Sequence, residues 1–170
     1  MRHWSTKKMV IFALFLAIGV VLNYAENVLI AIPVIPGIKL GIANTLGLLV
    51  LAYFGPVEFI LLGFLRVLLT SLFSGIGVAT IISFAGWLLS SAVVVGLYFT
   101  RQLSIFGLSL ISAVMHGLGQ IVVVSIIYET WGMFAYFPIL AISGIISGTL
   151  IAFLSRMIIL RLPLKESMLK

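Results

Sequence analysis

The chain has 170 residues, of which 63% are hydrophobic and only 8% are charged, and its formal net charge is +6. A soluble domain carries roughly 25% charged residues, so this chain cannot cover a water-facing surface. There are no cysteines, which excludes disulfides and thiol chemistry. The composition therefore predicts an all-α integral membrane protein with one domain, residues 1–170.

Six apolar runs are candidate membrane spans, since a span needs about 20 residues or fewer where protein shields it. In chain order they cover residues 9–31, 40–54, 57–73, 76–99, 105–128 and 134–160. The first run follows "MRHWSTKK" and exceeds the core of a signal peptide, with no small-residue cleavage site after it, so we interpret it as a span. Long continuous apolar runs favour helices over the alternating strands of a membrane barrel.

The basic residues orient these spans. With six spans, eight cations fall on one side of the membrane: Arg2, Lys7, Lys8, Arg101, Arg156, Arg161, Lys165 and Lys170. The positive-inside rule makes this side cytoplasmic, and it places both termini there. This distribution indicates membrane topology rather than a nucleic-acid-binding face. Lys39 falls on the outer side, and Arg66 falls within the membrane.

Arg66 interrupts the apolar run "LLGFLRVLLTSLF" about nine residues into the third span, which is roughly 14 Å deep at the helical rise. A cation facing lipid at that depth would cost at least about 3 kcal/mol. Arg66 should therefore face the bundle interior or a wet cavity. It could bind a carboxylate or phosphate of a ligand, or it could be satisfied internally by Glu26 or by backbone carbonyls.

Other polar residues gather in the outer halves of the spans. His116 and Gln120 lie at i and i+4 in "MHGLGQ" and so share a helix face. Asn23 and Glu26 lie near the outer end of the first span, and Lys39 and Asn44 begin the second. This asymmetry predicts a pocket that opens outward. Hydrogen bonds between helices, and a rim position for Lys39, are the structural alternatives.

Three further features of the sequence each allow two explanations, one functional and one structural. Trp87, mid-span in "SFAGWLLS", could stack on a ligand or be core. Ala13 and Ala17, four residues apart, form a face that lets another helix approach closely, and Gly144 and Gly148 form a second such pair. Either pair could equally serve internal packing.

Absent motifs narrow the function. The chain contains no aspartate, so it has no aspartate-rich magnesium–diphosphate site. It also lacks the glycine–lysine pattern of a P-loop, a Ser–His–acid arrangement and a cluster of metal ligands. We therefore expect neither an autonomous enzyme nor a cofactor or metal site.

Four blocks carry a family resemblance: "PGIKLGIAN", "RVLLTSLFSG", "SFAGWLLS" and "HGLGQ". Their order and spacing resemble the Gx transporter family, often labelled heptaprenyl diphosphate synthase component I, over about residues 10–160. The chain departs from the family at Gly117, where Asn is usual. This family in turn resembles the S components of energy-coupling factor (ECF) transporters, which are six-helix proteins that bind a micronutrient from outside.

The resemblance implies a substrate-binding subunit of an ECF-type importer in the prokaryotic cytoplasmic membrane. Its partners would be membrane lipid, a transmembrane coupling subunit and a pair of ATPases. Ala13 and Ala17 match the A-x-x-x-A pattern with which S components dock on the coupling subunit. The ligand is expected to be a small anion, bound by the candidate residues Asn23, Glu26, Lys39, Asn44, Arg66, Trp87, His116 and Gln120. The alternatives are a membrane accessory subunit of prenyl diphosphate or quinone metabolism, and a structural scaffold.

The topology can be tested with single cysteines, since the chain has none. His3→Cys and Met168→Cys place one thiol near each terminus. We expect both to resist a membrane-impermeant thiol reagent in intact cells and to react after the cells are lysed. Labelling of either thiol from outside the cell would contradict the orientation.

Overall fold

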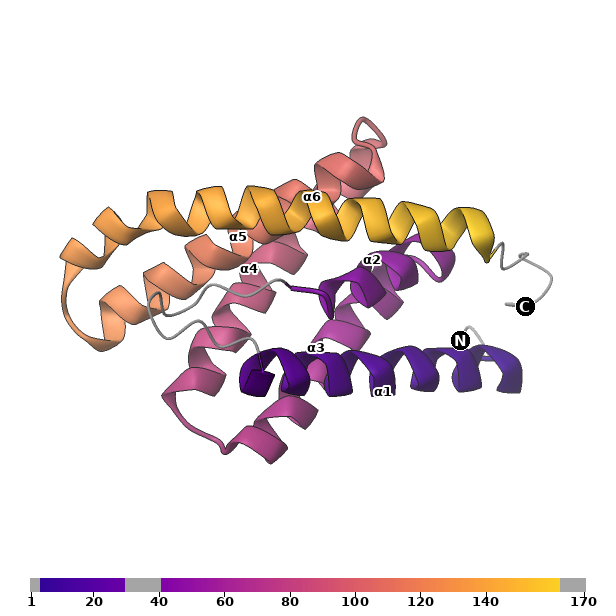
Figure 1. Cartoon of the computed structure of the whole chain (residues 1–170), viewed down its shortest axis with the longest axis horizontal. Coiled ribbons are helices and arrows are strands. Elements are labelled where there is room, and N and C mark those ends of the chain that lie inside the picture. The colour runs from indigo at the N-terminus through magenta and orange to yellow at the C-terminus, as the bar shows by residue number, and fades with distance from the viewer. Residues whose placement is uncertain (1–3, 30–40, 163–170) are drawn as a thin grey trace.

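The computed structural model describes residues 4–29 and 41–162. Within these ranges the regular elements are all helices (Figure 1), which confirms the predicted all-α fold with six helices. The last predicted span is divided into a short 3₁₀ helix and a long α-helix. The elements are α1 (Thr6–Leu29), α2 (Asn44–Tyr53), α3 (Pro56–Ser74), α4 (Val78–Thr100), α5 (Ile105–Ile127), η1 (Trp131–Tyr136) and α6 (Phe137–Arg161).

The helices differ in their reach across a membrane. In the described part of the chain, five helices are long and apolar enough to cross one. The sixth, α2, has 10 residues and is about 15 Å long, which is half of the roughly 30 Å hydrocarbon layer. The run at 40–54 is therefore a half-length helix preceded by a turn, because residues 41–43 are not helical.

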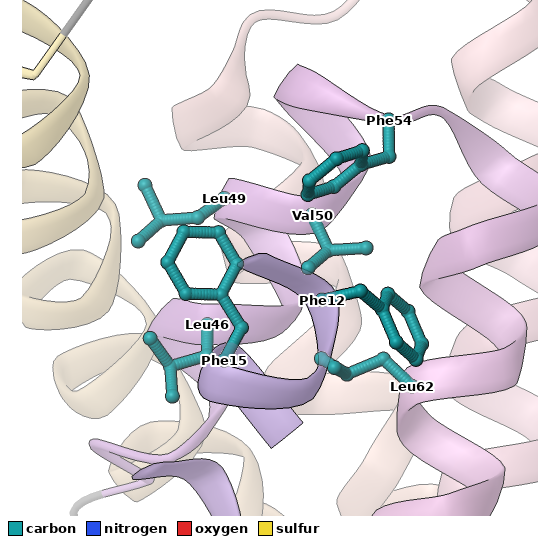
Figure 2. Close-up of a cluster of buried hydrophobic side chains, with 7 residues drawn as sticks. All are labelled: Phe12, Phe15, Leu46, Leu49, Val50, Phe54 and Leu62. Carbon is teal, nitrogen blue, oxygen red and sulfur yellow. The ribbon is translucent and has the colours of Figure 1, made fainter. Parts of the chain in front are cut away.

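The short helix α2 lies between α1 and α6 (Figure 1) and is buried on all sides, with every residue from 45 to 51 inside the protein. Its apolar side chains form a cluster with those of α1 and α3 (Figure 2). The members of this cluster are Phe12, Phe15, Leu46, Leu49, Val50, Phe54 and Leu62. A second cluster ties α2 to the other three helices, through Leu48, Leu51, Val94, Leu108 and Ile151.

Glycines set the close packing of α4, α5 and α6. A Cβ on Gly119 of α5 would lie 2.7 Å from the carbonyl oxygen of Ala85 on α4. A Cβ on Gly144 or Gly148 of α6 would come within 3.3 Å of the α5 backbone. The Ser109 hydroxyl also donates to the Gly148 carbonyl at 2.7 Å. The pair Gly144 and Gly148 therefore serves internal packing, as such small residues do in membrane bundles.

One end of the bundle brings together the start of α1, the junction of α2 and α3, and the end of α6. Lys8 of α1 forms an ion pair with Glu58 of α3, and the Tyr53 hydroxyl donates to the Leu162 carbonyl at 2.7 Å. Lys8 is buried and lies 5.0 Å from the ring centroid of Trp4. This residue, read from the sequence as a topological charge, thus also joins two helices. Which side of the membrane this end faces remains a prediction.

The Lys8–Glu58 pair allows a test of this packing. The two side chains are only 6% and 4% exposed, so Lys8→Met would leave Glu58 buried without its partner. We expect this change to cost roughly 3 kcal/mol or more of stability. The double variant Lys8→Met/Glu58→Gln should recover most of that loss.

The measurement is thermal unfolding of the protein in lipid nanodiscs. Lys7→Met is the matched control, because Lys7 is adjacent and exposed and its loss should change the melting temperature little. A Lys8→Met variant as stable as Lys7→Met would show that the ion pair contributes nothing to the fold.

Candidate functional site

The site is built around the first residues of α2. A helix leaves its first N–H groups without partners inside the helix, and within a membrane such groups need protein or a cavity. Here the turn before α2 supplies acceptors, because the Gly41 and Ile42 carbonyls accept from the Asn44 and Thr45 N–H groups. Glu26 of α1 holds this turn, since its Oε1 accepts from the Ile42 N–H at 2.7 Å. Asn44, the first residue of α2, turns its side chain to α3 instead.

Arg66 of α3 meets Asn44 at this point. Its Nη2 donates to Asn44 Oδ1 at 2.7 Å. Its Nε is buried, and no hydrogen-bond partner exists for it in the described part of the chain. A buried donor without a partner is uncommon and costly. The guanidinium is thus held in place by one nitrogen and keeps unused donor capacity for an acceptor such as a carboxylate or phosphate oxygen.

Glu26 is the carboxylate whose charge acts on Arg66, and both residues border the same cavity. The ion pair that the sequence left as an alternative is not formed. In the described chain the ion pair within 4.0 Å is that of Lys8 with Glu58. Glu26 instead uses its Oε1 on the start of α2. The two charged side chains therefore border one cavity without bonding to each other.

Two cavities meet at the Arg66–Asn44 hydrogen bond. The outer, polar cavity has a volume of about 110 Å³, and nine of the 16 residues that line it have polar side chains. The inner cavity, of about 30 Å³, is lined by residues of α2 to α6. Four residues border both cavities: Asn44, Arg66, Ala113 and His116. The hydrogen-bonded pair therefore lies at the boundary between the two spaces.

The structure brings most of the candidate residues to these cavities. Asn23, Glu26 and Gln120 border the outer cavity, and Trp87 borders the inner one. Asn44, Arg66 and His116 border both, while Lys39 lies outside the described residues. Side chains far apart in sequence thus converge as expected, and their role toward a ligand stays a prediction.

Trp87 has a packing role as well as a place in the cavity wall. It is 8% exposed, and its indole nitrogen would lie 2.2 Å from a Cβ on Gly63 of α3. Glycine at position 63 is what lets the ring sit there. The indole N–H has no hydrogen-bond partner in the described structure. Trp87 is therefore a core residue that also lines the inner cavity, and stacking on a ligand stays a prediction.

Serines line both cavities and were not predicted. Those of the outer cavity are Ser83, Ser143 and Ser147, and those of the inner cavity are Ser90, Ser91, Ser109 and Ser112. Several donate to carbonyls of their own helix, as Ser90 does to Trp87, which is common in apolar helices. The i, i+4 spacing of Ser143 and Ser147 was the available signal. Sequence alone could not separate such local bonding from a cavity wall.

The chemistry of the site suits binding. Within residues 4–29 and 41–162, no three His or Glu side chains come together as a metal site would require. The polar groups that border the outer cavity are one guanidinium, one carboxylate, three side-chain amides, one imidazole and the serine hydroxyls. A small polar or anionic group would find charge and hydrogen bonds there.

The fold and the cavities define a multi-pass helical membrane protein with a polar cavity inside its bundle. The comparison with protein families then identifies the lineage: the chain belongs to the family described as heptaprenyl diphosphate synthase component I, which it matches over residues 15–158. The resemblance stated from the four sequence blocks is confirmed for that family. Neither the curated proteins nor the solved structures contain a significant match to the chain.

The role of Glu26 at the start of α2 can be tested by two substitutions. Glu26→Gln keeps an oxygen that can accept from the Ile42 N–H, whereas Glu26→Leu leaves that donor unpaired. We expect Leu to cost roughly 1–3 kcal/mol and Gln to cost less. Thermal unfolding in nanodiscs and hydrogen exchange at the Ile42 amide measure the two effects.

Glu129→Gln is the control, because Glu129 is exposed at the end of α5. Equal protection of the Ile42 amide in the Leu and Gln variants would show that Glu26 does not hold the start of α2.

Proposed function

We propose that this chain is the substrate-binding membrane subunit of an ECF-type importer in the prokaryotic cytoplasmic membrane. It captures a small anionic micronutrient or cofactor precursor in the outer cavity. The observation that carries the proposal is Arg66, whose guanidinium borders both cavities and whose Nε has no partner within the described chain.

The free-energy cost of keeping the Arg66 cation inside the bundle supports a binding role. A cation inside a membrane protein is retained where it is paired, hydrated or used. Asn44 is a neutral partner that leaves the full positive charge in place, and Glu26 forms no ion pair with it in the described structure. An anionic ligand would complete both the charge balance and the hydrogen bonding of Arg66.

The surface of α1 supports a coupling role. Ala13 and Ala17 are both exposed on the bundle, so neither alanine is taken up by packing inside this chain. They lie beside larger exposed side chains, such as Val10 and Leu14. Two small residues one turn apart leave a shallow face on which a helix of a coupling subunit can pack closely.

The family description favours a second candidate function, a membrane accessory subunit of prenyl diphosphate metabolism. In that role Arg66 would bind the diphosphate of a lipid, and an aspartate-bearing partner would supply the catalysis that this aspartate-free chain does not hold. The two functions differ in the partner that they require.

Co-purification from native membranes separates the two candidates. We expect the tagged chain to retain a membrane coupling protein and a pair of ATPases. Ala13→Leu or Ala17→Leu should reduce this association at least several-fold, because a bulky side chain blocks close helix packing. Ala92→Leu is the control, since Ala92 is also exposed but lies on α4.

Recovery of a soluble aspartate-rich synthase in place of ATPases would favour the second candidate. Association that is unaffected by Leu at both positions 13 and 17 would remove α1 as the coupling face.

A further inference from the structure

An apolar cavity of about 610 Å³ adjoins the polar site. It lies between α4, α5 and η1, and its wall continues to the start of α6. The residues that border it are Ile82, Gln120, Ile121, Val124, Gly132, Met133, Ala135, Tyr136 and Leu140. Apart from Gln120 and the hydroxyl of Tyr136, these side chains offer nothing to a polar ligand.

The apolar and polar cavities share part of their walls. Gln120 and Leu140 border both of them. Gln120 lies one helical turn beyond His116, which borders the polar cavity. A molecule bound at Arg66 would therefore have to pass between Gln120 and Leu140 to reach the apolar space beside η1.

The polar cavity is too small to hold a whole organic ligand. The polar cavity measures about 110 Å³, whereas pockets for organic ligands commonly measure roughly 300–1,000 Å³. It has room for a carboxylate or a phosphate but not for a whole vitamin-sized molecule. The rest of the ligand must occupy a neighbouring space.

A second neighbouring space is less suited to this. A cavity of about 200 Å³ between α1, α3 and α4 is lined with hydroxyl groups and shares Asn23, Val67 and Ser83 with the polar cavity. Several of its polar groups already bond within the protein, as Ser71 does to the Leu68 carbonyl and Asn23 does to Thr70. The apolar cavity offers more volume, and binding there is stabilised by each apolar ligand atom that is removed from water.

We infer that the ligand of this protein is amphipathic, with one anionic group bound at Arg66 and an apolar body held in the cavity between α4, α5 and η1. The inference rests on the ligand-binding part of the proposed function, but it does not depend on the importer partners. A chain that binds such ligands and retains no ATPases would fail as an importer subunit and still satisfy this inference.

Three small probes separate the charge from the apolar body. 4-Phenylbutyrate carries both, 4-phenyl-1-butanol lacks the charge, and acetate lacks the body. Each is titrated against the full chain in lipid nanodiscs, and its dissociation constant is obtained from the ligand-dependent rise in melting temperature. We expect 4-phenylbutyrate to bind at least tenfold more tightly than acetate, since about two buried methylene groups already give that factor. We expect it to bind at least tenfold more tightly than the alcohol as well, because a hydrogen bond between charged groups is worth about that factor.

Matched variants locate the two halves of the probe. Arg66→Met should abolish the advantage of 4-phenylbutyrate over 4-phenyl-1-butanol, and Arg66→Lys should keep part of it. Val124→Phe fills the apolar cavity and should weaken 4-phenylbutyrate at least several-fold while leaving acetate unchanged. Val123→Phe is the control, because Val123 is the adjacent valine on α5 and does not border this cavity.

Ala135→Phe, on η1, provides a second filling variant if Val124→Phe does not fold, and folding is judged from the melting temperature without probe. Equal binding of the acid and the alcohol would show that the apolar space takes up only lipid-like molecules and would overturn the inference. So would binding of 4-phenylbutyrate that is no tighter than that of acetate, or that is unchanged in the folded filling variants.

Discussion

The start of α2 inside the bundle is the constraint on which the rest of the structure depends. A helix of 10 residues is too short to carry its first N–H groups out to water across the hydrocarbon layer. Those groups must be satisfied where they lie, and irregular backbone at membrane depth is tolerated where protein or a cavity surrounds it. The turn before α2 meets much of this requirement, because the Gly41 and Ile42 carbonyls accept from the Asn44 and Thr45 N–H groups. Glu26 holds that turn by accepting from the Ile42 N–H.

The same constraint explains why α2 is apolar all round. Its side chains contact α1 and α3 in one cluster (Figure 2) and α4, α5 and α6 in the other. The short helix therefore fills the centre of the bundle only along its own length, and space for a cavity is left beyond its first residue. The polar cavity lies at the start of α2, and Asn44 is both the first residue of this helix and part of the cavity wall.

Arg66 connects this architecture to chemistry. Its hydrogen bond to Asn44 fixes the guanidinium against the start of α2, while its buried Nε has no hydrogen-bond partner in the described structure. A ligand oxygen placed there would gain a charged donor in a region of low dielectric, where such bonds are strong.

The sequence by itself determined the solvent, the helical class and the number of helices, because apolar content and run length are local properties that no packing can reverse. It also indicated Arg66, since a cation is conspicuous in an apolar run. Only the tertiary structure decided that Asn44 rather than Glu26 bonds Arg66, that Lys8 is buried against Glu58, and that serines line the cavities. These outcomes depend on which helix faces which, and nearly uniform apolar helices carry no periodicity that records their facing.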